Sequence, residues 1–202
     1  EYGKIAEKLR DVPGVIGIEV NISCPNVENR GLVFACDPNS ATDVIHAVKR
    51  NVSANLPIFA KLSPDVTDIA LIAKAVVSAG VDGLSVINTL LGMVIDTNTL
   101  KPKLSGKTGG LSGPAIRPVA VRCVYQIRQA LPNIPIIGMG GIRTGNDALE
   151  FFAAGANALS VGTIVFNDPQ ACVRIHNEVA EKLHEKGIHS LSEVINAAHR
   201  RN

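Results

Sequence analysis

Apolar runs that alternate with helical patterns constrain the fold of this chain more than any other feature of its sequence. Five runs rich in Val, Ile and Leu are typical of buried strands, and each is followed by a segment with apolar residues at helical spacing. The expected strands cover residues 14–22, 57–62, 81–88, 134–139 and 158–161. Regular alternation of strand and helix predicts an α/β protein with a parallel sheet, and no change in composition divides it. We expect one domain over residues 1–202.

Helices are expected before, between and after these strands. They cover residues 1–10, 39–52, 67–80, 114–131, 145–154 and 168–186. Pro114 lies at one expected start and Gly80 at one expected end, as helix-terminal Pro and Gly usually do. The segment 89–113 is long and rich in glycine. We expect it to hold a short hairpin, and loops of this length are usually functional.

Two glycine-containing strand ends distinguish between the architectures that this pattern allows, an open doubly wound sheet and a (β/α)8 TIM barrel. Gly140-Gly141 and Gly162-Thr163 follow the fourth and fifth strands and leave backbone N–H groups uncovered. Barrels bind phosphate with such groups after their seventh and eighth strands. Either pair alone would also suit a tight turn, but both together favour the barrel. We therefore expect strands 4 to 8 of a larger TIM barrel, with three βα units, on the order of 100 residues, before them.

A thiol after the first strand is the leading candidate for chemistry. The sequence Asn21-Ile-Ser-Cys-Pro-Asn26 follows the apolar run directly, and Pro25 both removes a ladder donor and restricts Cys24. In α/β folds the carboxyl ends of parallel strands are where ligands bind. Cys24 is therefore either an inert buried thiol, as most free cysteines are, or a reactive group between two carboxamides.

Lys61 is unusual because it interrupts the apolar run Ile-Phe-Ala-Lys-Leu. Burial of an unpaired lysine is costly, so either a structural ion pair or a bound anion or electron-rich ring must face it. We favour a ligand, because the glycine pairs already imply a phosphate nearby. Asn88 and Thr89 add a carboxamide and a hydroxyl at the third strand end. With a lone thiol that can accept a proton, this set favours a phosphorylated cofactor such as flavin mononucleotide (FMN).

Composition argues against several other classes of protein. A formal charge of +2 and 3% aromatic residues argue against nucleic-acid binding. No apolar run reaches the roughly 20 residues that span a bilayer, so no membrane association is expected. The four cysteines are scattered without a CxxC pair or Cys/His spacing, which predicts no metal site. Reduced thiols without a secretory signal predict a cytoplasmic protein.

Six motifs occur in order along the chain. They are Asn21-Ile-Ser-Cys-Pro-Asn26, Phe59-Ala-Lys-Leu-Ser-Pro64, Val86-Ile-Asn-Thr-Leu-Leu-Gly92, Gly109-Gly-Leu-Ser-Gly-Pro-Ala115, Ile137-Gly-Met-Gly-Gly-Ile142 and Val161-Gly-Thr163. Together they resemble the dihydroorotate dehydrogenase family, over residues 5–185 and over the C-terminal two-thirds of that family's sequence. The resemblance implies an FMN-containing (β/α)8 barrel that oxidises (S)-dihydroorotate to orotate in pyrimidine (UMP) biosynthesis.

The resemblance also implies a role for each matching residue. Cys24 corresponds to the base that removes the C5 proton of dihydroorotate while hydride passes from C6 to flavin N5. Lys61 corresponds to a lysine beside the flavin ring, whose charge stabilises the reduced flavin. The residues implied to bind substrate are Asn21, Asn26, Asn88 and Thr89. The residues implied to bind FMN are Asn21, Lys61, Ile87, Gly113, Gly140, Gly141, Gly162 and Thr163.

The subtype and its partners follow from the same resemblance. Cys24 is similar to the base of the soluble class 1 enzymes, since the quinone-using class has serine. Residues 88–96 and 109–114 resemble the NAD-linked 1B subtype more than the fumarate-using 1A subtype. A 1B catalytic subunit is implied to form a homodimer and to pass electrons to NAD through a partner subunit, which carries FAD and an iron–sulfur cluster.

Two alternatives stay open at this point. The flavin domain of dihydropyrimidine dehydrogenase shares the Ser-Cys-Pro element, although Asn26-Val27 and residues 90–92 argue against it. The other alternative is an inactive barrel fragment. The family's N-terminal strands supply further flavin contacts and an Asn-rich loop that grips substrate, and these 202 residues contain neither.

Overall fold

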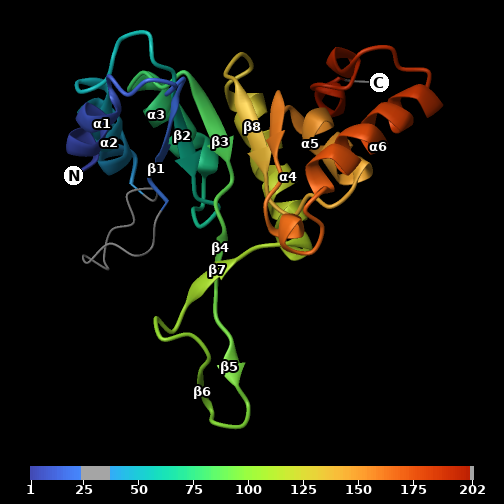
Figure 1. Cartoon of the computed structure of the whole chain (residues 1–202), viewed down its shortest axis with the longest axis horizontal. Coiled ribbons are helices and arrows are strands. Elements are labelled where there is room, and N and C mark those ends of the chain that lie inside the picture. Colours follow the sequence, from blue (N-terminus) through green and yellow to red (C-terminus); the bar gives the residue numbers. More distant parts are fainter. Residues whose placement is uncertain (24–36, 201–202) are drawn as a thin grey trace.

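The central sheet has five parallel strands in sequential order. The computed structural model describes residues 1–23 and 37–200, and within them the sheet runs β1 (Ile18–Asn21), β2 (Ile58–Leu62), β3 (Gly83–Val86), β8 (Ile136–Met139) and β9 (Ala158–Ser160). Figure 1 shows β1, β2, β3 and β8 in this order across the molecule. All five predicted strands are confirmed, and each is shorter than the apolar run that predicted it.

The α-helices that the structure describes agree with the predicted ones to within three residues at either end. They are α1 (Tyr2–Leu9), α2 (Pro38–Lys49), α3 (Ile69–Ser78), α4 (Arg117–Ala130), α5 (Gly145–Ala154) and α6 (Ala171–Glu185). Aspartates cap two of them. Asp37 accepts the N–H of Ser40 at 2.8 Å, and Asp68 accepts the N–H of Ala70 at 2.9 Å. In this part of the chain no helix is both long and apolar enough to cross a membrane.

All the helices lie in one layer against one face of the sheet. Each helix contacts the next along the chain, from α1 to α6. The register aligns Val20, Ala60, Leu84 and Ile136 across four strands, and all four side chains are buried under this layer. Burial of a Val, Leu or Ile side chain contributes about 1.5–3 kcal/mol. Sequential strand order under a single helix layer excludes the doubly wound alternative, in which the order reverses and helices cover both faces.

Within residues 1–23 and 37–200, no helix covers the opposite face of the sheet. Glu19 and Asn21 are exposed there, and Phe59 and Lys61 are partly exposed, because alternate residues of a strand point to opposite faces. The TIM-barrel prediction is therefore met only in part. The parallel five-stranded sheet is present, but the barrel is not closed, because β1 and β9 are edge strands within the described residues.

The predicted insertion is an antiparallel ribbon that projects away from the sheet (Figure 1). Near its base β4 (Leu90–Gly92) pairs with β7 (Gly109–Leu111), and farther out β5 (Ile95–Asp96) pairs with β6 (Lys101–Pro102). Several apolar side chains on the ribbon are exposed, including Leu91, Met93, Val94, Leu100 and Leu104. The expected hairpin is confirmed, with two short ladders in place of one.

Candidate active site

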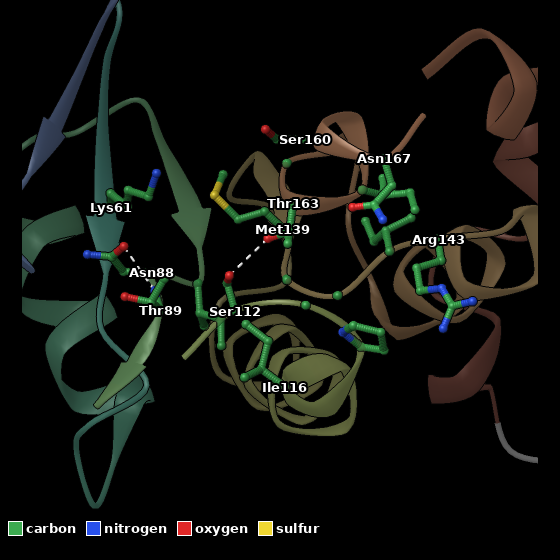
Figure 2. A pocket seen from close by; sticks show the side chains of 18 residues that line it. Lys61, Asn88, Thr89, Ser112, Ile116, Met139, Arg143, Ser160, Thr163 and Asn167 are labelled. Carbon is green, nitrogen blue, oxygen red and sulfur yellow. Dashed lines mark hydrogen bonds between the residues drawn. The ribbon is translucent and has the colours of Figure 1, made fainter. Parts of the chain in front are cut away.

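A cavity of about 450 Å³ opens at the carboxyl ends of β2, β3, β8 and β9. Figure 2 shows Lys61, Asn88 and Thr89 on one side of it, across from Met139 and Thr163. The predicted site residues that line it are Lys61, Ile87, Asn88, Thr89, Gly113, Gly140, Gly141, Gly162 and Thr163. The parallel sheet therefore brings together residues that lie far apart in the sequence.

One end of the cavity is formed mainly by backbone, and we call it the glycine end: Gly113, Gly140, Gly141, Gly162 and Thr163. Three of these glycines have positive φ angles, of +87° at Gly113, +127° at Gly140 and +77° at Gly141. A Cβ on Gly141 would lie 2.6 Å from the carbonyl oxygen of Gly113, whereas a Cβ on Gly162 would meet nothing within 4 Å. Within the described residues, the N–H groups of Gly140, Gly141, Gly162 and Thr163 donate to no acceptor.

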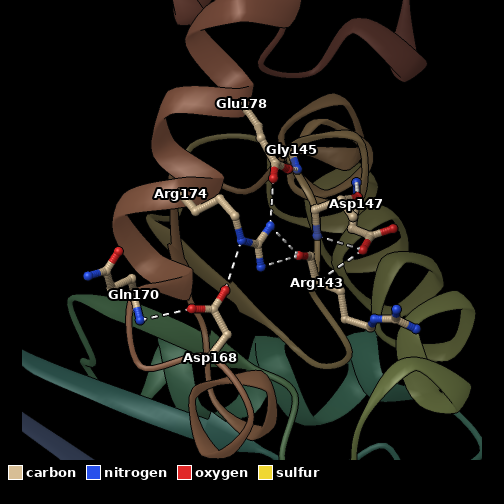
Figure 3. Close-up of polar contacts among 8 residues, drawn as sticks. Arg143, Gly145, Asp147, Asp168, Gln170, Arg174 and Glu178 are labelled. Carbon is tan, nitrogen blue, oxygen red and sulfur yellow. Dashed lines mark hydrogen bonds and ion pairs between the residues drawn. The ribbon is translucent and has the colours of Figure 1, made fainter.

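A charged network behind the glycine end holds the loop after the glycine pair against α6 (Figure 3). The guanidinium of Arg174 donates twice to the carbonyl oxygen of Arg143, at 3.2 Å each, and binds Asp168 and Glu178 at 2.8 and 2.6 Å. Glu178 also accepts the N–H of Gly145 at 2.6 Å. This N–H and Arg174 lower the pKa of Glu178 below its ordinary 4.5, and the two carboxylates raise the pKa of Arg174.

The other end of the cavity is lined by the polar side chains of Lys61, Asn88 and Thr89, and Asn21 contacts Asn88; we call these four residues the polar end. The Asn88 Nδ2 donates to Asn21 Oδ1 at 3.5 Å, a long contact, and Asn88 Oδ1 accepts the N–H of Thr89 at 2.9 Å. Asn21 does not line the cavity itself. It reaches the site through Asn88, which does.

Lys61 has both of the surroundings that the sequence left open, an ion-pair partner and a cavity that could hold a ligand. Its Nζ lies 3.1 Å from Glu19 Oε1, so a structural ion pair is present. Lys61 also lines the cavity. The sequence favoured a ligand over an ion pair as the partner of Lys61. An ion pair is present as well, because the strand register brings in a carboxylate that is remote in sequence.

Two predicted residues, Cys24 and Asn26, lie outside the described residues. The last described residue before them is Ser23, which is 5% exposed and whose hydroxyl donates to the Lys61 carbonyl oxygen at 2.7 Å. Ser23 therefore lies beside Lys61 of the polar end. Across residues 1–23 and 37–200, no group of three or more His, Cys, Asp or Glu could hold a metal ion.

Several cavity residues were missed by sequence reasoning. Side chains of Ser112, Arg143 and Asn167 line the cavity at or near the glycine end (Figure 2). Thr163 Oγ1 donates to Ser112 Oγ at 3.0 Å, which joins the loop before α4 to the end of β9. Ser112 lies within one of the six motifs, and Arg143 follows a glycine pair closely, so both had a signal. Asn167 lies in a loop of ordinary composition and had none.

Comparison of the sequence with known proteins shows the family of this chain. The sequence profile of the family described as dihydroorotate dehydrogenase matches residues 1–183. A protein of Geobacter sp. (strain M21) named "Dihydroorotate dehydrogenase B (NAD(+)), catalytic subunit" is 52% identical over 197 residues, which cover 98% of this chain and 64% of that protein. Proteins of the same name from Desulforamulus reducens and Listeria monocytogenes serotype 4a are 52% and 50% identical.

The chain therefore belongs to the dihydroorotate dehydrogenase family. The match with the Desulforamulus reducens protein includes 98% of this chain but only 64% of that relative. The corresponding shares for the Listeria monocytogenes relative are 96% and 63%. The chain thus spans less than two-thirds of the relatives it matches.

Proposed function

We propose that this chain is the catalytic part of an FMN-dependent dihydroorotate dehydrogenase, which oxidises (S)-dihydroorotate to orotate in pyrimidine biosynthesis. The observation that carries the proposal is that the glycine end and Lys61, Asn88 and Thr89 line the same cavity. Membership of the family and the names of the relatives support the same activity.

FMN is the cofactor that suits the glycine end. Backbone N–H groups without acceptors at Gly140, Gly141, Gly162 and Thr163 suit a phosphate group, which offers only acceptor oxygens. The open space beside Gly162 leaves room for a ligand to approach the backbone closely. When bound, FMN supplies the acceptor for the hydride that leaves the substrate. The residues that would hold it are those of the glycine end together with Asn21, Lys61 and Ile87.

The polar end suits dihydroorotate, whose ring amides donate and accept hydrogen bonds and whose carboxylate accepts them. The carboxamides of Asn21 and Asn88 can do the same, and Thr89 adds a hydroxyl. We assign a further substrate contact to Asn26 and the role of base to Cys24, which takes the C5 proton of dihydroorotate. The position of Ser23 beside Lys61 supports this assignment, since it brings the chain to the polar end one residue before Cys24.

The electron acceptor and the partners follow from the 1B subtype. We propose NAD as the final acceptor, reached through a partner subunit that carries FAD and an iron–sulfur cluster, because the relatives are named as NAD-linked catalytic subunits. We also propose a homodimer and a cytoplasmic location. The exposed apolar side chains of the ribbon, such as Leu91, Met93 and Leu100, offer a surface for one of these protein partners.

The base assignment is tested by Cys24→Ser in the FMN-loaded protein. A hydroxyl is a far weaker base than a thiolate, so we expect reduction of the flavin by dihydroorotate to slow by about 100-fold or more at neutral pH. Single-turnover absorbance measurements without oxygen report this rate. Cys172→Ser, which alters an exposed thiol away from this cavity, is the matched control and should leave the rate unchanged. An unchanged rate in Cys24→Ser would remove Cys24 from its role.

A further inference from the structure

Glu19 carries a charge to which the proposed reaction assigns no role. Its Oε1 accepts a hydrogen bond from Lys61 Nζ at 3.1 Å, although 42 positions separate the two residues. The register explains the contact. Asn21 of β1 pairs with Lys61 of β2, and Glu19 lies two residues earlier on the same face as Asn21. The ion pair therefore depends on the sheet and not on local sequence.

This ion pair lies on the face of the sheet that none of the described helices covers. The side chains of Glu19 and Lys61 are 41% and 22% exposed. Ion pairs with this degree of exposure contribute little to folding stability, so stability alone explains the pair poorly. Lys61 also lines the cavity, on the side of Asn88 and Thr89 (Figure 2). Lys61 therefore contacts a carboxylate and also lines the cavity in which we propose that FMN binds.

No other side chain competes for the Lys61 ammonium in the described part of the chain. Ser85 of β3 pairs with Lys61 in register and points to the same face. Its hydroxyl is fully buried and makes no hydrogen bond with the described residues. Among those residues, Glu19 is thus the side chain that holds the ammonium group.

We propose that Glu19 is a positioning residue that orients Lys61 and moderates the positive charge that Lys61 presents to the bound flavin. This inference rests on the proposed function, because it requires FMN in the cavity. A flavin gains negative charge when it is reduced, so positive charge beside it favours the reduced form and negative charge opposes it. Glu19 therefore keeps the reduction potential of the flavin below the value that an unpaired Lys61 sets.

The test is the reduction potential of the FMN-loaded protein, measured without substrate by equilibration with redox dyes. Glu19→Gln keeps the size of the side chain and removes its charge, so we expect the potential to shift in the positive direction. Lys61→Met removes the ammonium group and should shift the potential in the negative direction. Opposite shifts are the signature of a charge pair that acts on the flavin, and a purely structural contact would not produce them.

Two further variants keep the test decisive. Glu7→Gln makes the same change at an exposed position on α1 and should leave the potential unchanged. Glu19→Asp keeps the charge but withdraws it from Lys61, so the potential should shift positively by less than in Glu19→Gln; this variant carries the test if Glu19→Gln does not fold. An unshifted or negatively shifted potential in a folded, FMN-loaded Glu19 variant overturns the inference. Failure of the unaltered protein to bind FMN would instead overturn the proposed function.

Discussion

The two ends of the cavity differ in how they are built. The glycine end is made of backbone in conformations that suit glycine, and charged side chains behind it hold its loop in place. The polar end is made of side chains from β1, β2 and β3, which depend on contacts between strands. This difference implies that the glycine end binds the cofactor and that the polar end serves the chemistry. A change at the glycine end should remove the cofactor, whereas a change at the polar end should leave the cofactor bound and alter the chemistry.

The largest expected effect is on the glycine end. Gly141 has a φ of +77°, and a Cβ there would lie 2.6 Å from the carbonyl oxygen of Gly113. We expect Gly141→Ala to weaken FMN binding on the order of 100-fold, since backbone strain and the clash together cost about 3 kcal/mol. Fluorescence titration with FMN measures this loss. Gly106→Ala is the matched control, because the nearest atom to its Cβ would lie at an ordinary 3.6 Å.

A second change tests whether the glycine end depends on packing at the opposite ends of the same strands. Arg128 is 5% exposed, and its guanidinium donates to the Gly155 carbonyl oxygen at 2.8 and 3.0 Å and to Asn157 Oδ1 at 2.8 Å. Arg128→Met removes both guanidinium donors to the Gly155 carbonyl oxygen and leaves Asn157 Oδ1 with only the N–H of Ile136, so it should lower the free energy of unfolding by about 2 kcal/mol. Denaturant unfolding measures the change.

The control for Arg128 lies on the same helix. Arg122 makes one exposed hydrogen bond, to Gln126, so Arg122→Met should leave stability nearly unchanged. The folded fraction of Arg128→Met should still bind FMN as tightly as the unaltered protein. A loss of FMN affinity equal to that of Gly141→Ala would show that the glycine end is not an independent feature.

A third change alters only the polar end of the cavity. Asn88 lines the cavity and joins Asn21 to the site. We expect Asn88→Ala to raise the KM for dihydroorotate about tenfold, in line with the loss of about 1.5 kcal/mol from hydrogen bonding, and to leave the Kd for FMN unchanged. Steady-state kinetics and FMN titration on the same preparation separate the two effects. Equal losses in both would contradict a division of labour between the two ends.

The smallest expected effect concerns the network behind the glycine end. The pKa of Glu178 is lowered in the folded protein, so its contribution to stability is fully present above its ordinary pKa of 4.5 and is lost as the pH falls through the lower folded value. Glu178→Gln should therefore make thermal stability less dependent on pH below 4.5. Glu181→Gln, at an exposed position on the same helix, should keep the pH dependence of the unaltered protein.

Much of the fold and of the glycine end could be predicted from the sequence, because both have local signals. The spacing of apolar residues indicates the strands and helices, and the predicted bounds of α5 agree with the observed ones. Gly140, Gly141, Gly162 and Thr163 were predicted from their position after strands, and all four line one cavity. Glycine is informative here because few other residues tolerate a backbone that approaches a ligand closely.

The polar end could be predicted only in part, because its contacts join distant residues. The carboxylate that meets Lys61 could not be identified without the register of β1 against β2. The same limit hid the contact between Arg174 and the carbonyl oxygen of Arg143, which lies 31 positions earlier in the sequence. The uncovered face of the sheet was also missed, since apolar runs predicted strands buried on both faces. Local patterns report conformation well, but they report partners across a sheet poorly.

The most direct test of the central claim is anaerobic reduction of the FMN-loaded protein by two related substrates. Dihydroorotate carries a carboxylate that dihydrouracil lacks, and the polar end is proposed to bind that ring with its carboxylate. The account predicts that dihydroorotate bleaches the flavin absorbance within a single turnover and that dihydrouracil does not. Bleaching by dihydrouracil alone, or by neither compound, would contradict the assignment of this cavity to dihydroorotate oxidation.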